Sequence, residues 1–188
     1  MKRYLVKDLM VLRDEYAVIK ENATIFEAVK ALETAQQEFD QTRYRHRAVL
    51  VEDENGRIVG KLGQHDILRA LEPGYEDIKS KSSAVAHLGF SKRFIESMIE
   101  NYRLFDKPLE KICEKAGQQN VRKYMHVPTE GEFIEEEASL DLAIHLLVLG
   151  HHQSLLVTRE EEIIGILRLT DVFAAIFHSM EECFADQK

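Results

Sequence analysis

The apolar positions of the first half change from the run of a strand to the spacing of a helix. Residues 16–20 predict a short strand. Thr24 and Glu27 follow with the three-residue spacing of a capping box. Behind them, apolar side chains recur at the spacing of one helix face, at Ala28, Val29, Leu32 and Ala35. The pattern therefore predicts a strand followed by an amphipathic helix.

A hairpin and a second helix complete this half. Residues 48–52 and 57–62 predict two strands, and the Asp-Glu-Asn-Gly sequence between them is a turn with glycine placed for positive φ. Asp66 then opens a helix over residues 67–71 and is a plausible N-cap for it. The first half is thus predicted to be a β-α-β-β-α unit.

The same order of elements returns in the second half. Strands are expected at 132–135, 154–158 and 163–167, with helices after Ser139 and from Asp171. A shift of 115 positions places Val6 on Val121, Met10 on Met125 and Ile19 on Ile134. Beyond the first helix the shift is 105, which places Gly60 on Gly165 and Asp66 on Asp171. The chain therefore contains an internal duplication.

Neither unit can cover its small sheet alone, so we expect the two to pack sheet to sheet around a joint core. The predicted fold is of the α/β (α+β) class, with two pseudo-symmetric units and an all-helical insert between them. The expected divisions are residues 1–71, the insert 72–119, residues 120–178, and a C-terminal tail 179–188.

The insert carries apolar stripes that something must cover. Residues 77–88 predict a weak helix, Ser91 caps a better one, and a third begins near Pro108 and ends at Gly117. The stripes are explained either by packing on the two units as extra core or by a dimerisation or effector surface. If the insert lies over a cleft, it also serves as a lid.

Composition narrows the classes of function. The 188 residues are 45% hydrophobic, which suits a globular protein, and the net charge of −8 argues against binding a nucleic-acid backbone. Cys113 and Cys183 are isolated, which favours free thiols in a reducing compartment. Neither a signal peptide nor an apolar stretch of membrane-spanning length is visible, so we expect a cytoplasmic protein without membrane contact.

The chain offers little to catalysis or metal binding. No GxSxG, HExxH or GxxxxGK[ST] sequence is present, so we assign no catalytic residue. His145, His151 and His152 lack further ligands at the spacing that zinc requires, so we assign no metal ligand and no required cofactor. They are better explained as polar residues at a helix end.

The duplicated unit resembles the CBS repeat family. The segments that carry the resemblance are Val-Lys-Asp-Leu-Met at 6–10, Val-Arg-Lys-Tyr-Met at 121–125, and the stretches 48–68 and 154–173. The resemblance implies two repeats with two clefts between them, which in family members often hold AMP, ADP, ATP or S-adenosylmethionine. It also implies a homodimer of such pairs.

Carried over residue by residue, the resemblance gives a set of candidate ligand-binding positions. Asp66 and Asp171 take the positions that bind ribose hydroxyls, and Gly63 and Arg168 stand where a hydroxyl usually contacts phosphate. The base would lie along one of two stretches, and Thr170 adjoins the second Asp. The two stretches are His46-Arg47-Ala48 and His152-Gln153-Ser154. The proline usual in the middle strand is replaced by Leu50 and Leu156.

Several roles stay open at this stage. Asp66 and Asp171 either cap helices only or also bind ribose. Arg168 either grips a phosphate, fills the cleft, or bridges to acidic residues 160–162. Three arginines at alternating positions, Arg43, Arg45 and Arg47, either point into solvent or form an anion site.

Three hypotheses of function follow. The first is a regulatory module that binds an adenosyl ligand and signals to an unknown effector protein in trans. The second is a ligand-free structural or interaction module with the same fold. The third is a small enzyme that uses His and Glu residues of the cleft.

Overall fold

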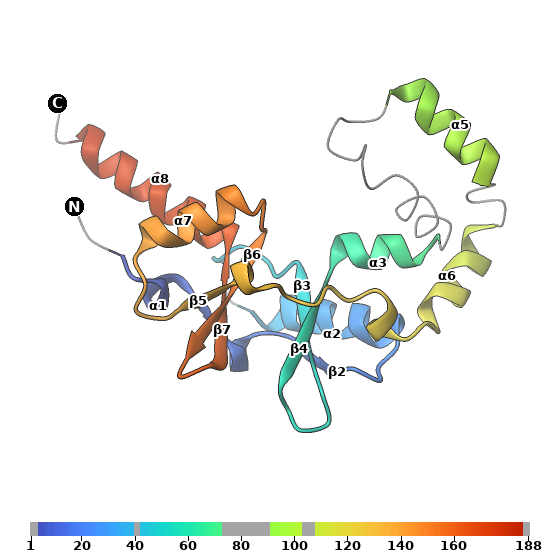
Figure 1. Ribbon diagram of the computed structural model, residues 1–188, viewed down its shortest axis with the longest axis horizontal. Helices are drawn as coiled ribbons and strands as arrows, with labels where there is room; N and C mark the ends of the chain where they lie inside the picture. The colour runs from blue at the N-terminus through green and yellow to red at the C-terminus, as the bar shows by residue number, and fades with distance from the viewer. Residues whose placement is uncertain (1–3, 40–41, 73–90, 103–107, 186–188) are drawn as a thin grey trace.

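The computed structural model describes residues 4–39, 42–72, 91–102 and 108–185. Figure 1 shows two small sheets that lie next to each other with helices packed around them. The first half contains α1 (Val6–Leu9), β1 (Val11–Leu12), β2 (Val18–Lys20), α2 (Ile25–Glu38), β3 (Ala48–Glu52), β4 (Ile58–Gly63) and α3 (Gln64–Ala70). The second half contains β5 (Phe133–Glu135), α7 (Leu140–Leu149), β6 (Ser154–Arg159), β7 (Glu162–Arg168) and α8 (Leu169–Ala185). The predicted mixed fold is confirmed.

The helix cap and the hairpin turn that the sequence predicts in the first half are both present. The Thr24 hydroxyl accepts from the Glu27 amide, and the Glu27 carboxylate accepts from the Thr24 amide at 2.7 Å. This capping box begins α2 because it satisfies amides that have no partner within the helix. Gly56 has a φ of +79°, as the turn between β3 and β4 requires.

The two sheets are built to the same register. In each, a parallel strand pairs with the middle strand, through Val18 opposite Leu50 and Phe133 opposite Leu156. The hairpin of each sheet also carries a bulge at the same place, after Val51 and after Val157. The duplication seen in the sequence is therefore a structural one.

Each half begins by crossing to the other half. Val11 in β1 pairs with Ile166 of β7, and His126 pairs with Lys61 of β4. The shift of 115 takes Val11 to His126, and the shift of 105 takes Lys61 to Ile166, so each pair is the equivalent of the other. The same exchange relates two further bridges, Leu5 with Ser139 and Asn120 with Thr24. A pseudo-twofold axis therefore relates the halves, and neither unit is complete without the other's leading segment.

Glycines permit this crossing at equivalent points of the two hairpins. A Cβ added to Gly165 would lie 2.5 Å from the Val11 carbonyl oxygen, and one added to Gly60 would lie 2.8 Å from Met125 Sδ. Such distances are too short for any other residue without movement of the partner. Both positions are therefore glycine because a segment of the opposite half passes over them.

A core shared by both halves lies between the sheets. Each half has its own buried cluster, and a third cluster combines Val11, Tyr16 and Leu50 with Leu156 and Ile166. All five side chains are at most 6% exposed. The expected sheet-to-sheet packing is confirmed, and Leu50 and Leu156 are both fully buried in this shared core.

The described part of the insert behaves in two ways. Helix α6 (Leu109–Gly117) packs on α2 and buries Ile112 and Ala116, so it extends the core of the first half. Helix α5 (Lys92–Tyr102) lies apart from both sheets, as Figure 1 shows, and its Phe94 and Ile99 side chains are exposed. The helix predicted at 77–88 lies outside the described residues.

Candidate ligand-binding site

A cavity of about 570 Å³ opens between the two halves. Its walls come from the ends of β4 and β7, the starts of α3 and α8, and the segments that lead into β3 and β6. Most of the expected site residues line it, namely Arg47, Ala48, Gly63, Asp66, His152, Gln153, Ser154, Arg168 and Thr170. His46 and Asp171 do not line it.

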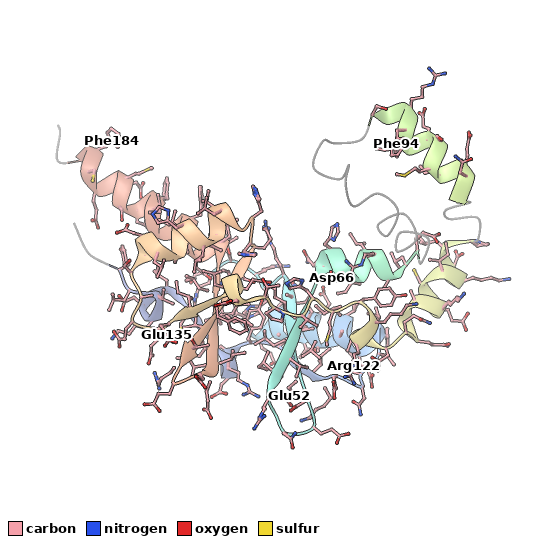
Figure 2. All side chains as sticks on the ribbon, viewed as in Figure 1. Glu52, Asp66, Phe94, Arg122, Glu135 and Phe184 are labelled. Carbon is pink, nitrogen blue, oxygen red and sulfur yellow. The ribbon has the colours of Figure 1, made fainter. Side chains whose placement is uncertain are left out.

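Asp66 lies at the mouth of this cavity, where α3 begins (Figure 2). Its Oδ2 atom accepts a hydrogen bond from the Gly63 amide at 2.9 Å, and Arg69 lies 3.5 Å from Oδ1. The expectation that Asp66 is the N-cap is wrong, because β4 runs directly into the helix and Gly63 takes that position. Asp66 is the third residue of the helix and caps it from inside the first turn.

Asp171 has the same place in α8 but different surroundings. Arg168 binds both of its carboxylate oxygens, with Nε 2.5 Å from Oδ2 and the terminal nitrogen Nη2 2.6 Å from Oδ1. The other terminal nitrogen of Arg168, Nη1, donates to the Tyr44 carbonyl oxygen at 2.7 Å. The Arg168 and Asp171 side chains are only 6% and 9% exposed. Arg168 therefore occupies the carboxylate of Asp171 and does not bridge to residues 160–162.

His46 lies next to Arg168 in the core. Its ring lies between those of Tyr16 and Phe39, with centroid distances of 4.4 and 4.1 Å, and its Nδ1 is 3.2 Å from Arg168. Burial, and then the charge of Arg168, lower the pKa of His46 to about 4. The ring is consequently neutral at physiological pH and accepts a hydrogen bond from the guanidinium. His46 therefore supports Arg168 from within the core.

A cluster formed by Lys61, His126 and the buried Glu132 lines another wall of the cavity. Lys61 Nζ lies 2.6 Å from Glu132 Oε2, and His126 Nε2 lies 2.5 Å from Glu132 Oε1. Lys61 also reaches the carbonyl oxygen of Ser154 at 3.3 Å. Burial alone would raise the pKa of Glu132, but the hydrogen bonds from Lys61, His126 and the Thr129 amide outweigh it and lower the value to about 2. Glu132 is thus a carboxylate at all ordinary pH values, and the cluster ties β4 to the second half.

Sequence reasoning missed this cluster, although the duplication contains its signal. The positions equivalent to Lys61, His126 and Glu132 in the other half are Ile166, Val11 and Ala17. All three of these are buried apolar residues. In one half, therefore, the ion pair of Lys61 and Glu132, together with His126, takes the place of apolar side chains.

The three alternating arginines do not act together. Arg43 lies near Glu15 and Asp171, at 3.9 and 4.0 Å, and over the Phe39 ring. Arg45 and Arg47 line the cavity and are exposed. Neither forms a salt bridge with any residue in the described part of the chain.

Among the residues that the structure describes, no group of three or more His, Cys, Asp or Glu side chains is placed to hold a metal ion. No helix among them has the length and apolar character needed to cross a membrane.

Two interlocked β-α-β-β-α units with a cleft at their seam define a tandem-repeat module of mixed structure. The family model described as the CBS domain matches residues 6–73 and 121–178, which is more than half of the chain. The chain therefore belongs to the CBS domain family. No individually curated protein sequence matches it significantly.

Solved structures share this fold at low sequence identity. A structure of CBSX2 in complex with AMP is 19% identical, with a TM-score of 0.57, and the match covers 94% of this chain and 98% of that one. CBSX2 from Arabidopsis thaliana, also 19% identical, gives a TM-score of 0.60 over 96% and 99%. A conserved protein from Pyrococcus horikoshii, 15% identical, gives 0.57 over 93% and 94%.

Proposed function

We propose that this chain is a regulatory module that binds an adenine nucleotide in the cavity on the Asp66 side and signals to another protein. The chain belongs to a family of typically regulatory domains, and one structural neighbour was solved in complex with AMP. The sequence also contains none of the catalytic motifs sought above.

Asp66 and Asp171 differ in their surroundings, and this difference favours Asp66 as the position that binds ribose. Asp66 lines the cavity, and among the described residues its carboxylate accepts one short hydrogen bond, from the Gly63 amide, with Arg69 3.5 Å from Oδ1. A carboxylate in that state can still accept hydrogen bonds from the two vicinal hydroxyls of a ribose. Asp171 has both oxygens bound by Arg168 and is buried. We infer that ribose binds at Asp66.

The position of the cavity supports a regulatory role. Its walls belong to both halves, with Asp66 and Arg47 from one and His152 and Ser154 from the other. A ligand that contacts both walls binds more tightly to one relative angle of the halves than to another, and thereby shifts their equilibrium. An effector protein that contacts the outside of the module can respond to that shift.

Calorimetry of the purified chain with AMP, ADP, ATP and S-adenosylmethionine tests the proposal. We expect binding that Asp66→Asn weakens at least about tenfold, because charge-assisted hydrogen bonds contribute about 1.5–3 kcal/mol. Asp141→Asn is the matched control, since Asp141 is an exposed residue in the first turn of α7 and does not line the cavity. Unchanged affinity in Asp66→Asn would refute the choice of cleft.

A ligand-free structural module is the second candidate function. The observation that favours it is Arg168, whose guanidinium binds both carboxylate oxygens of Asp171, the ribose position that the resemblance implies in the second repeat. If none of the four compounds binds at millimolar concentration, this candidate replaces the first.

We further propose that two copies of the chain meet along α8. Phe173, Phe177, Met180 and Phe184 recur at helical spacing on this helix and are each at least 50% exposed. Figure 2 shows Phe184 near the end of α8, away from the sheets. Light scattering is expected to give a dimer for the native chain and a monomer for Phe177→Glu, with Glu181→Gln as control on the same helix.

A further inference from the structure

The cavity is more basic than the molecule around it. The chain has a net charge of −8, yet the charged side chains that line the cavity are Arg45, Arg47, Lys61 and Arg168 against Asp66 and Glu132. Lys61 forms a salt bridge with Glu132, and Arg168 forms one with Asp171. Among the described residues, Arg45 and Arg47 have no acidic partner, and Asp66 has Arg69 at 3.5 Å from Oδ1.

The two arginines lie together beside Asp66. They flank the buried His46 in sequence, and both line the cavity together with Asp66. The Arg47 carbonyl oxygen accepts the Gln64 amide at 2.9 Å, which places this segment against the start of α3. Two like charges so placed repel each other unless an anion lies between them.

We propose that the ligand of this cavity is a nucleotide with two or three phosphates, and that Arg45 and Arg47 bind its terminal phosphates. The inference rests on the proposed function and narrows the class of ligand. With ribose at Asp66, a phosphate chain meets Gly63, which has no side chain to fill the space, and then Arg47. Guanidinium groups bind phosphate oxygens through two parallel hydrogen bonds, and two of them match more than one phosphate.

The charges also explain what the cavity excludes. S-adenosylmethionine carries a sulfonium cation where a nucleotide carries its first phosphate, and this cation would approach the two arginines. AMP offers a single phosphate, which lies beside Gly63 and does not extend to the two arginines. The order of affinity expected from the charges is ATP and ADP first, then AMP, then S-adenosylmethionine.

The experiment compares dissociation constants of AMP, ADP, ATP and inorganic tripolyphosphate for the full chain by calorimetry. We expect ADP and ATP to bind at least about tenfold more tightly than AMP. The Arg45→Gln, Arg47→Gln double variant should bring ADP and ATP to the level of AMP while AMP changes by less than about threefold. Arg57→Gln is the matched control, because Arg57 is exposed and does not line the cavity.

The outcomes separate this inference from the function on which it rests. Equal affinities for AMP and ATP, or a preference for ATP that survives in the double variant, would overturn the inference while nucleotide binding stands. Tripolyphosphate that binds as tightly as ATP would overturn the role of the nucleoside. Binding of no compound at all would remove both. In Asp66→Asn, every nucleotide should weaken by the same factor, so that the ratio of ADP to AMP persists.

Discussion

Replacement of Gly165 by alanine tests the interlock of the two halves directly. The new methyl group would lie 2.5 Å from the carbonyl oxygen of Val11 and 3.2 Å from Met10 Sδ. The nearest obstacle is backbone that pairs with β7, so relief requires β1 to move away from the sheet. Insertion of a methylene into a packed site costs about 1–3 kcal/mol, and we expect Gly165→Ala to reach the upper part of that range.

The equivalent substitution in the first half meets a softer obstacle. At Gly60 the nearest atom is Met125 Sδ at 2.8 Å, followed by the His126 carbonyl oxygen at 3.1 Å. A methionine side chain can rotate away, so we expect Gly60→Ala to cost about half as much as Gly165→Ala. Addition of Met125→Ala should recover about 1 kcal/mol for Gly60→Ala, whereas Met10→Ala should recover little for Gly165→Ala.

Urea unfolding followed by circular dichroism measures these differences in free energy of unfolding. Gly117→Ala serves as control, because its methyl group would make an ordinary contact of 3.5 Å with Phe26 and alanine favours the helix. We expect that variant to be neutral or up to about 1 kcal/mol more stable. If Gly165→Ala were as stable as the native chain, the leading segment of the first half could not cross β7 as described.

Two further predictions concern buried charge. Glu132→Gln leaves Lys61 without its carboxylate partner and should lower the free energy of unfolding by about 3–5 kcal/mol. Adding Lys61→Ile, the residue type at the equivalent position, should recover part of this loss in a double-mutant cycle. If the effects of the two single substitutions were simply additive, the pairing of Lys61 with Glu132 would be contradicted. His46 has a pKa of about 4 in the folded chain and an ordinary value of 6.5 in the unfolded chain. As the pH falls from 6.5 to 4, the unfolded chain therefore binds a proton that the folded chain does not, and the free energy of unfolding decreases by up to about 3 kcal/mol. Thermal melts across that range should show a smaller pH dependence in His46→Gln, and identical curves would argue against a buried neutral ring.

The elements of the fold could be predicted from the sequence because their signals are local. The Thr24–Glu27 capping box and the glycine at 56 each act within four residues, and both have the predicted geometry. The crossing of the leading segments could not be predicted, because β1 is two residues long and pairs with a strand more than 150 positions away. Its only trace in the sequence is a glycine at the same place in both hairpins, Gly60 and Gly165.

The positions of the candidate site residues could be predicted from the sequence, but the hydrogen bonds of their side chains could not. The repeat places Asp66 and Asp171 correctly at the start of two helices, and symmetry alone treats them as equal. What separates them is the residue three positions earlier, since Gly63 contributes only an amide and Arg168 contributes a guanidinium that reaches both oxygens of Asp171. Whether an arginine there points to a ligand or to its own helix depends on Tyr44 and His46, which are distant in sequence.

The two repeats thus carry different side chains at equivalent positions along their seam. On one side, Arg168 binds both oxygens of Asp171 and donates to the neutral ring of His46, and the positions around the β1 crossing are apolar. On the other side, an aspartate is left with a free capacity to accept hydrogen bonds, and the crossing is held by Lys61 and Glu132. A buried ion pair contributes less to stability than well-packed apolar side chains of similar volume. Each side nevertheless contains one, Arg168 with Asp171 or Lys61 with Glu132, so the ion pair does not by itself distinguish the sides. What distinguishes them is that Arg168 binds the Asp171 carboxylate, whereas Asp66 lines the cavity.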